Sequence, residues 1–103
     1  MYRVVKRDGR IVDFEISKIA NAMKKAFDAT ETNYNQSVID FLAVMVTADF
    51  QPKITDELIH IEDIQDSVET VLEQAGYTDV AKAYILYRKQ REKMRNMKST
   101  ILN

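Results

Sequence analysis

The chain has 103 residues and no cysteine, which suits a single domain and excludes a disulfide scaffold, a cysteine-ligated zinc site and a cysteine nucleophile. Hydrophobic residues make up 46% of the chain and charged residues 30%, with two Gly and one Pro. This composition is typical of a compact, helix-rich domain. No apolar run is long enough for a membrane span or a signal peptide, so we expect a cytoplasmic protein without a membrane partner.

The net charge of −1 hides a strong segregation of charge along the chain. Residues 1–27 hold seven Lys/Arg and three Asp/Glu, and residues 76–103 hold seven Lys/Arg and two Asp/Glu. Between them, residues 28–75 hold one Lys and eleven Asp/Glu. Charge distribution reports on partners rather than on fold, so the two basic ends are predicted to serve an anionic partner.

The chain opens with a predicted β-hairpin. Residues 2–7 and 10–14 are rich in β-branched and aromatic side chains, and Asp8-Gly9 between them favours a two-residue type I′ turn. The short apolar segment at residues 58–61 is expected to add a third strand beside the hairpin. An isolated hairpin is only marginally stable, so this one must pack on the rest of the domain.

Four amphipathic helices are expected after the hairpin, because apolar residues recur at helical spacing. Ser17 is the expected N-cap of the first helix, and Pro52 ends the second. Gly76 is placed to terminate the third helix, and Thr78 or Asp79 to cap the fourth. The expected helices cover about residues 18–29, 38–50, 62–75 and 80 to the end of the chain.

The residues give little support to catalysis. His60 is the only histidine and is expected at a strand edge, and no serine has an obvious base nearby in the sequence. Phosphate-loop, dinucleotide-binding and metalloprotease motifs are absent. Acidic pairs such as Asp63/Asp66 share a helix face, but this spacing is more typical of a solvated face than of a metal or acid–base site. We therefore expect no catalytic residue and no metal held by protein side chains.

The cations of the hairpin are the first candidate site. A two-residue turn would place Arg7 opposite Arg10. A phosphate between them would relieve the repulsion of these like charges, because a guanidinium group binds phosphate oxygens in a bidentate manner. Lys18 is expected in the first helical turn, where the helix dipole disfavours a cation, so it too favours a bound anion. The alternative is that these residues are solubilising surface charges.

The last helix supplies a second cationic set, with two tyrosines interleaved. Tyrosines at such positions are more often part of the core than of a ligand site, although a tyrosine with a free hydroxyl could bridge the core and the ligand site. The set comprises Lys82, Tyr84, Tyr87, Arg88, Lys89 and Arg91.

Several stretches of the chain resemble the ATP-cone, a nucleotide-sensing regulatory domain of ribonucleotide reductases and of a bacterial repressor of their genes. The resemblance covers about residues 2–91. The run from Ala83 to Arg88, and the tail as far as Thr100, are most similar to the anaerobic, glycyl-radical class. The matching stretches are residues 4–10, Phe14, residues 17–19, 61–69 and 80–88.

The resemblance implies an α+β, mainly α fold, in which a four-helix bundle is capped by a small three-stranded sheet that includes the N-terminal hairpin. It divides the chain into a cone at residues 1–91 and a helical extension at residues 92–103, directed toward a catalytic domain. ATP or dATP would lie between sheet and helices, with Mg²⁺ on its phosphates. The implied nucleotide-binding residues are Val5, Lys6, Arg7, Lys18, Lys82, Tyr87, Arg88 and Arg91.

The function implied is allosteric regulation of deoxyribonucleotide biosynthesis. The domain would sense the ATP/dATP balance and switch an anaerobic ribonucleotide reductase, through the catalytic domain or through self-association of the cone. Two alternatives stay open, namely the cone of a nucleotide-responsive transcriptional regulator and a stand-alone protein-interaction bundle. The repressor relatives carry a cysteine-rich zinc ribbon ahead of the cone, and the lack of cysteine here disfavours a nucleic-acid partner.

Overall fold

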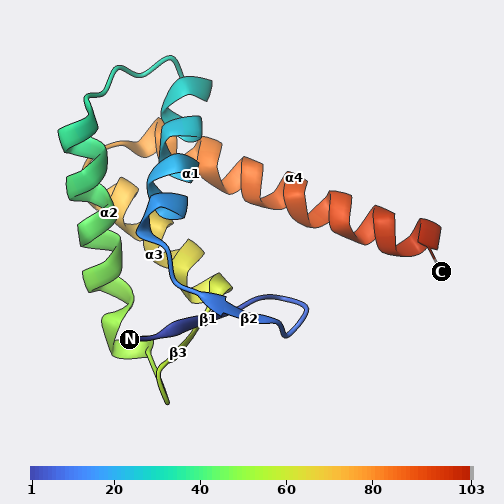
Figure 1. Cartoon of the computed structure of the whole chain (residues 1–103). Coiled ribbons are helices and arrows are strands. Elements are labelled where there is room, and N and C mark those ends of the chain that lie inside the picture. The colour runs from blue at the N-terminus through green and yellow to red at the C-terminus, as the bar shows by residue number, and fades with distance from the viewer. Residues whose placement is uncertain (103) are drawn as a thin grey trace.

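The computed structural model describes the backbone of residues 1–102 and the side chains of residues 1–98. It confirms the predicted α+β, mainly α architecture, with the small sheet at one end of the helices (Figure 1). The strands are β1 (Arg3–Val5), β2 (Ile11–Asp13) and β3 (Leu58–His60). The helices are α1 (Ile16–Ala29), α2 (Gln36–Phe50), the short 3₁₀ helix η1 (Gln51–Lys53), α3 (Ile61–Gln74) and α4 (Thr78–Leu102).

The sheet has the order β2-β1-β3, so the first strand of the chain is the central one. β1 is antiparallel to β2 and parallel to β3, with Val4 opposite both Val12 and Ile59. The predicted third strand is therefore confirmed, and His60 lies at its end on an edge of the sheet. Val4 and Ile59 are buried, which anchors the sheet to the helical core.

The hairpin turn differs from the prediction. Lys6 lies opposite Arg10, with its N–H donating to the Arg10 carbonyl at 2.8 Å, and the Gly9 N–H donates to the Lys6 carbonyl at 3.0 Å. Within the turn only Gly9 has a positive φ, of 88°, whereas a type I′ turn needs positive φ at Asp8 as well. The two-residue turn was wrong, and the loop has three residues. This register turns Val4 toward the core, which a shift of one residue would prevent.

Three aromatic rings fasten the sheet to the helices. Tyr2, just before β1, and Phe14, just after β2, lie together at the base of the hairpin, with their ring centroids 4.8 Å apart. Both rings pack on Phe50 at the end of α2, at 5.8 Å and 5.7 Å. Since such pairs add to the free energy gained from burial, this cluster holds the base of the hairpin in place while its tip projects from the domain.

The helices bury the apolar stripes that the spacing predicts, with small differences at their ends. Ile16, the first residue of α1, is 42% exposed. Ser17 is not the N-cap, because α1 already begins at Ile16 and Glu15 precedes it without a side-chain cap. Thr78 likewise lies inside α4 rather than ahead of it. The buried helical residues include Met23, Phe27, Ile39, Leu42, Val46, Ile64, Val68, Val71, Leu72, Val80 and Tyr84.

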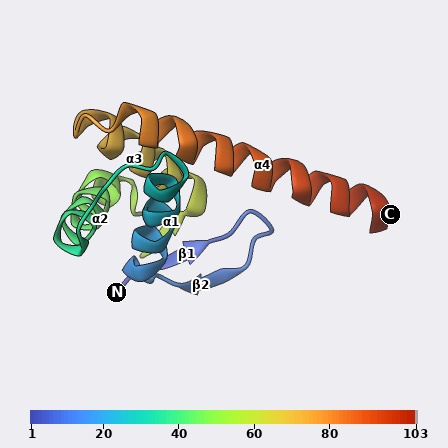
Figure 2. The same ribbon diagram turned by 90° about the horizontal axis from the view of Figure 1, so that it is seen from above.

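The helix termination predicted at Gly76 is confirmed. Gly76 has a φ of 88°, its N–H donates to the Glu73 carbonyl at 3.0 Å, and the Tyr77 N–H donates to the Leu72 carbonyl at 2.9 Å. This pair of bonds is the Schellman arrangement, in which glycine adopts the left-handed conformation without steric cost. It reverses the chain so that α4 packs on α3 and α1 and then extends beyond the other helices (Figure 2).

Nothing in the described part of the chain is both long and apolar enough to form a membrane-spanning helix.

Candidate functional site

The cations of the hairpin point in different directions. Arg10 pairs with Asp8, with Nε 2.7 Å from the Asp8 carboxylate, and the Arg10 backbone N–H bond lowers the pKa of Asp8. Arg7 instead reaches α3, where its Nη2 donates to Gln65 Oε1 at 2.9 Å and its Nη1 lies 3.6 Å from Glu62 Oε1. The expected contact between Arg7 and Arg10 was therefore wrong, because the three-residue loop separates the two side chains.

Arg88 also lies against α3. Its Nη1 donates to Asp66 Oδ1 at 2.8 Å and to Glu69 Oε2 at 2.6 Å, and its side chain is 19% exposed. Burial alone would lower the pKa of Arg88, but the hydrogen bonds to Asp66 and Glu69 outweigh burial and raise that pKa. The guanidinium thus stays fully charged while it joins α4 to α3.

The two arginines follow each other along one side of α3. Their partners Glu62, Gln65, Asp66 and Glu69 occupy successive turns, so that they share a helix face; we call these four residues the α3 acidic face. The structure thereby brings a cation from each basic end of the chain onto the acidic middle. No local spacing indicates these contacts, since they join segments far apart in the sequence.

A second cationic group lies where α4 crosses α1. Lys25 Nζ lies 5.9 Å from the centroid of the Tyr87 ring, and the Arg91 guanidinium lies 5.8 Å from the same centroid. Arg91 Nη1 also lies 3.4 Å from the Tyr87 hydroxyl. Two cations at one ring, in this Tyr87 cluster of Lys25, Tyr87 and Arg91, give α4 a positively charged, partly aromatic surface. No pattern in the sequence points to Lys25, because only the packing of α1 on α4 brings it to Tyr87.

The neighbouring Tyr84 belongs to the core, as expected for most tyrosines in this helix. Its side chain is 5% exposed. Burial raises the pKa of Tyr84 to about 12, with Glu69 and Asp66 adding to the effect and Arg88 opposing it.

The remaining predicted nucleotide-binding residues are more scattered. Val5, at the end of the central strand β1, and Lys6, which directly follows it, are half-buried. Lys18 is 67% exposed and pairs with Glu15 at 3.1 Å. Lys82 is exposed and, at about 100° per residue, projects from the side of α4 opposite the buried Tyr84. The structure therefore groups Arg7 with Arg88, and Tyr87 with Arg91, but it brings neither Lys18 nor Lys82 into these groups.

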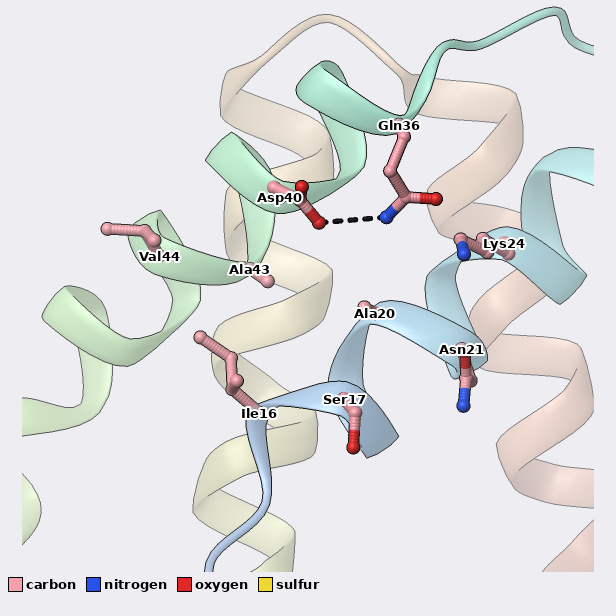
Figure 3. A pocket seen from close by; sticks show the side chains of 9 residues that line it. All are labelled: Ile16, Ser17, Ala20, Asn21, Lys24, Gln36, Asp40, Ala43 and Val44. Carbon is pink, nitrogen blue, oxygen red and sulfur yellow. Dashed lines mark hydrogen bonds between the residues drawn. The ribbon is translucent and has the colours of Figure 1, made fainter.

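A hollow of about 330 Å³ lies on another side of the domain, between α1 and α2 (Figure 3). Its only cation is Lys24, and its carboxylate, Asp40, accepts a 2.8 Å hydrogen bond from Gln36. A triphosphate needs several cations, so the charge of this hollow does not suit one. The lining residues, none of which is a predicted nucleotide-binding residue, are Ile16, Ser17, Ala20, Asn21, Lys24, Gln36, Asp40, Ala43 and Val44.

Across the described residues, no three or more His, Asp or Glu side chains are grouped so that they could hold a metal ion.

Comparisons with known proteins agree with the architecture. The profile of the ATP cone domain matches residues 2–93. The chain is 41% identical over 98 residues to a ribonucleoside-diphosphate reductase subunit alpha of Chlamydia pneumoniae, covering 89% of this chain and 9% of that protein. It is 42% identical over 100 residues to a vitamin B12-dependent ribonucleoside-diphosphate reductase of Thermoplasma acidophilum, covering 92% and 12%.

An anaerobic ribonucleoside-triphosphate reductase of Haemophilus influenzae is 35% identical over 100 residues, covering 97% of this chain and 14% of that protein. The chain thus spans about a tenth of the length of these relatives, which are reductases of three kinds. With nearly its whole length matched to one profile, the chain belongs to the ATP-cone domain family.

Proposed function

We propose that this ATP-cone binds ATP or dATP as an allosteric ligand and thereby regulates the activity of a ribonucleotide reductase. The observation that carries the proposal is the convergence of cations from both ends of the chain. Arg7 from the hairpin and Arg88 from α4 meet on α3, and the Tyr87 cluster lies on the same helix α4. A nucleoside triphosphate is the anion that the family offers for these cations.

In the proposed site, the phosphates are bound by the hairpin cations and by α4, and Mg²⁺ accompanies them. The Tyr87 ring, flanked by Lys25 and Arg91, offers a surface for stacking or phosphate contacts. Lys18 and Lys82 join only if their exposed side chains turn toward the ligand. The proposed nucleotide-binding residues are Val5, Lys6, Arg7, Lys18, Lys82, Tyr87, Arg88 and Arg91.

Regulation requires two conformations of the domain that bind ATP and dATP with different affinity. The two nucleotides differ by one 2′-hydroxyl, and a ligand can shift an equilibrium only by its difference in affinity for the two states. The domain would transmit the shift to the catalytic part of the reductase or to a second cone. The anaerobic class is our proposal for the parent enzyme, supported by the run from Ala83 to Arg88 and by the Haemophilus influenzae relative.

The test is titration calorimetry of the folded domain with ATP and with dATP, each with Mg²⁺. We expect heat of binding with at least one of them, and sedimentation with each nucleotide then shows whether the domain self-associates. A folded sample that gives no heat with either nucleotide would refute the proposal. Binding to duplex DNA with a steep salt dependence would instead favour the transcriptional alternative.

A further inference from the structure

The carboxylates of the α3 acidic face fully neutralise the positive charge of the two arginines that lie on it. Two guanidinium groups, those of Arg7 and Arg88, meet three carboxylates, those of Glu62, Asp66 and Glu69. The side chains of Arg7 and Arg88 are 25% and 19% exposed, so solvent screens these ion pairs only in part. In this arrangement the group offers no net attraction to an anion, although it contains two of the proposed phosphate-binding residues.

We propose that Glu62, Asp66 and Glu69 are internal competitors of the nucleotide, holding Arg7 and Arg88 on α3 until the phosphates displace them. This inference rests on the proposed function and adds a control element to the same site. A phosphate group carries more charge than a carboxylate and binds guanidinium groups with similar fork geometry, so the exchange is chemically favourable. Breaking the carboxylate contacts lowers the apparent affinity, because only the domain with released arginines is competent to bind.

The exchange also has a mechanical consequence. Arg7 is the side chain through which the hairpin tip contacts α3, whereas the other residues of the loop are exposed. Arg88 fastens α4 to α3 at the last point where α4 has buried or half-buried residues, since residues 89–98 are all exposed. Removal of both arginines from α3 therefore releases the hairpin tip from α3 and, at the same time, breaks the ion pairs that join α4 to α3. Both segments extend to the same side of the domain (Figures 1 and 2).

The first test compares nucleotide affinity among single charge-removing variants of α3. Glu69→Gln and Glu62→Gln should each tighten ATP binding, by about three- to tenfold for Glu69→Gln and by less for Glu62→Gln, whose carboxylate is more exposed. Glu73→Gln is the matched control, because Glu73 is an exposed acid one turn beyond Glu69 on the same helix and is not one of the three carboxylates paired with Arg7 or Arg88. Equal affinity of wild type and Glu69→Gln would overturn the inference.

A double-mutant cycle separates competition for an arginine from general repulsion of the phosphates. In an Arg7→Ala background, Glu62→Gln should no longer tighten ATP binding, because the carboxylate would act only through Arg7. If Glu62→Gln tightens binding equally with and without Arg7, simple repulsion accounts for the effect and the inference fails. Both side chains lie at the surface, so these variants should fold.

A third measurement needs no nucleotide. In Glu62→Gln the amides of Lys6 and Gly9, which are hydrogen-bonded within the loop, should exchange with solvent several-fold faster than in wild type. Unchanged exchange would mean that the ion pair does not hold the tip, which overturns the inference. Failure of the proposed function looks different, because then neither wild type nor any variant binds ATP or dATP while the exchange difference persists.

Discussion

Arg88 Nη1 lies 2.6 Å from Glu69 Oε2, and this contact joins the last helix to the third across a half-buried interface. Asp66 shares the same nitrogen at 2.8 Å. The acidic middle of the chain is thus more than a solvated surface, because one face of α3 supplies the counterions for both basic ends.

Arg88→Ala should lower the free energy of unfolding by about 1–2 kcal/mol, because it leaves the half-buried Glu69 carboxylate without its partner. Urea denaturation monitored by circular dichroism measures the change. Arg95→Ala, on the exposed part of the same helix, is the control and should have little effect. Equal stability of Arg88→Ala and wild type would show that the contact contributes nothing to the fold.

Lys6→Ala and Arg91→Ala should each weaken ATP binding by about 1–3 kcal/mol, the cost of one lost charge-assisted hydrogen bond. Neither side chain is buried, so the fold should stay intact. Lys53→Ala is the control, since Lys53 is exposed in η1, outside the proposed site. Calorimetry gives the affinities, and an unchanged value for both site variants would move the site elsewhere.

The domain should lose stability between about pH 10 and pH 12, and Tyr84 should account for part of the loss. Burial raises the pKa of Tyr84 to about 12, so above pH 10 the folded state retains a proton that the unfolded chain releases. The contribution is fully present below pH 10 and is lost as the pH rises through the folded-state pKa, by roughly 2–3 kcal/mol in total. Tyr84→Phe should therefore flatten the decline in unfolding free energy, and identical slopes for the two proteins would contradict this assignment.

Glu57→Gly should stabilise the domain by about 0.5–1 kcal/mol. Asp56 and Glu57 have φ of 54° and 61° in the two-residue turn between Thr55 and Leu58, where the left-handed conformation favours glycine. Thermal unfolding measures the gain.

Gly76→Ala tests the same backbone effect in the opposite direction, because it removes a glycine from a left-handed position. Gly76 has a φ of 88° and a Cβ would meet no atom within 4 Å, so the substitution should cost about 1 kcal/mol through backbone conformation alone. A stabilised Gly76→Ala variant would contradict the role of this glycine in ending α3.

Local patterns predicted most of the fold. The apolar stripes indicated the helices, and glycine and proline indicated where α2 and α3 end. The hairpin register failed because Asp8-Gly9 suits two turn geometries, which differ in whether Asp8 needs a positive φ. The choice depends on burial of Val4 and on its pairing with Ile59, neither of which the hairpin sequence contains.

The candidate site could be predicted from the sequence less well than the fold. The resemblance proposed Arg7 and Arg88 as ligands of phosphate, but the carboxylates that hold them belong to a helix distant from both in sequence. Lys25 gave no signal, because its role depends on the crossing of α1 and α4. Long-range pairing of this kind follows from the tertiary structure and not from residue spacing.

The central position of β1 governs the order in which the domain can assemble. Val4 has Ile59 as its parallel neighbour, so closing this pair brings together segments separated by two complete helices. Loop-closure entropy makes such a late, non-local pairing slow compared with the formation of the helices. A domain that has been synthesised only as far as α2 therefore holds a hairpin without its third strand, and the hairpin completes its native pairing only after β3 has been made.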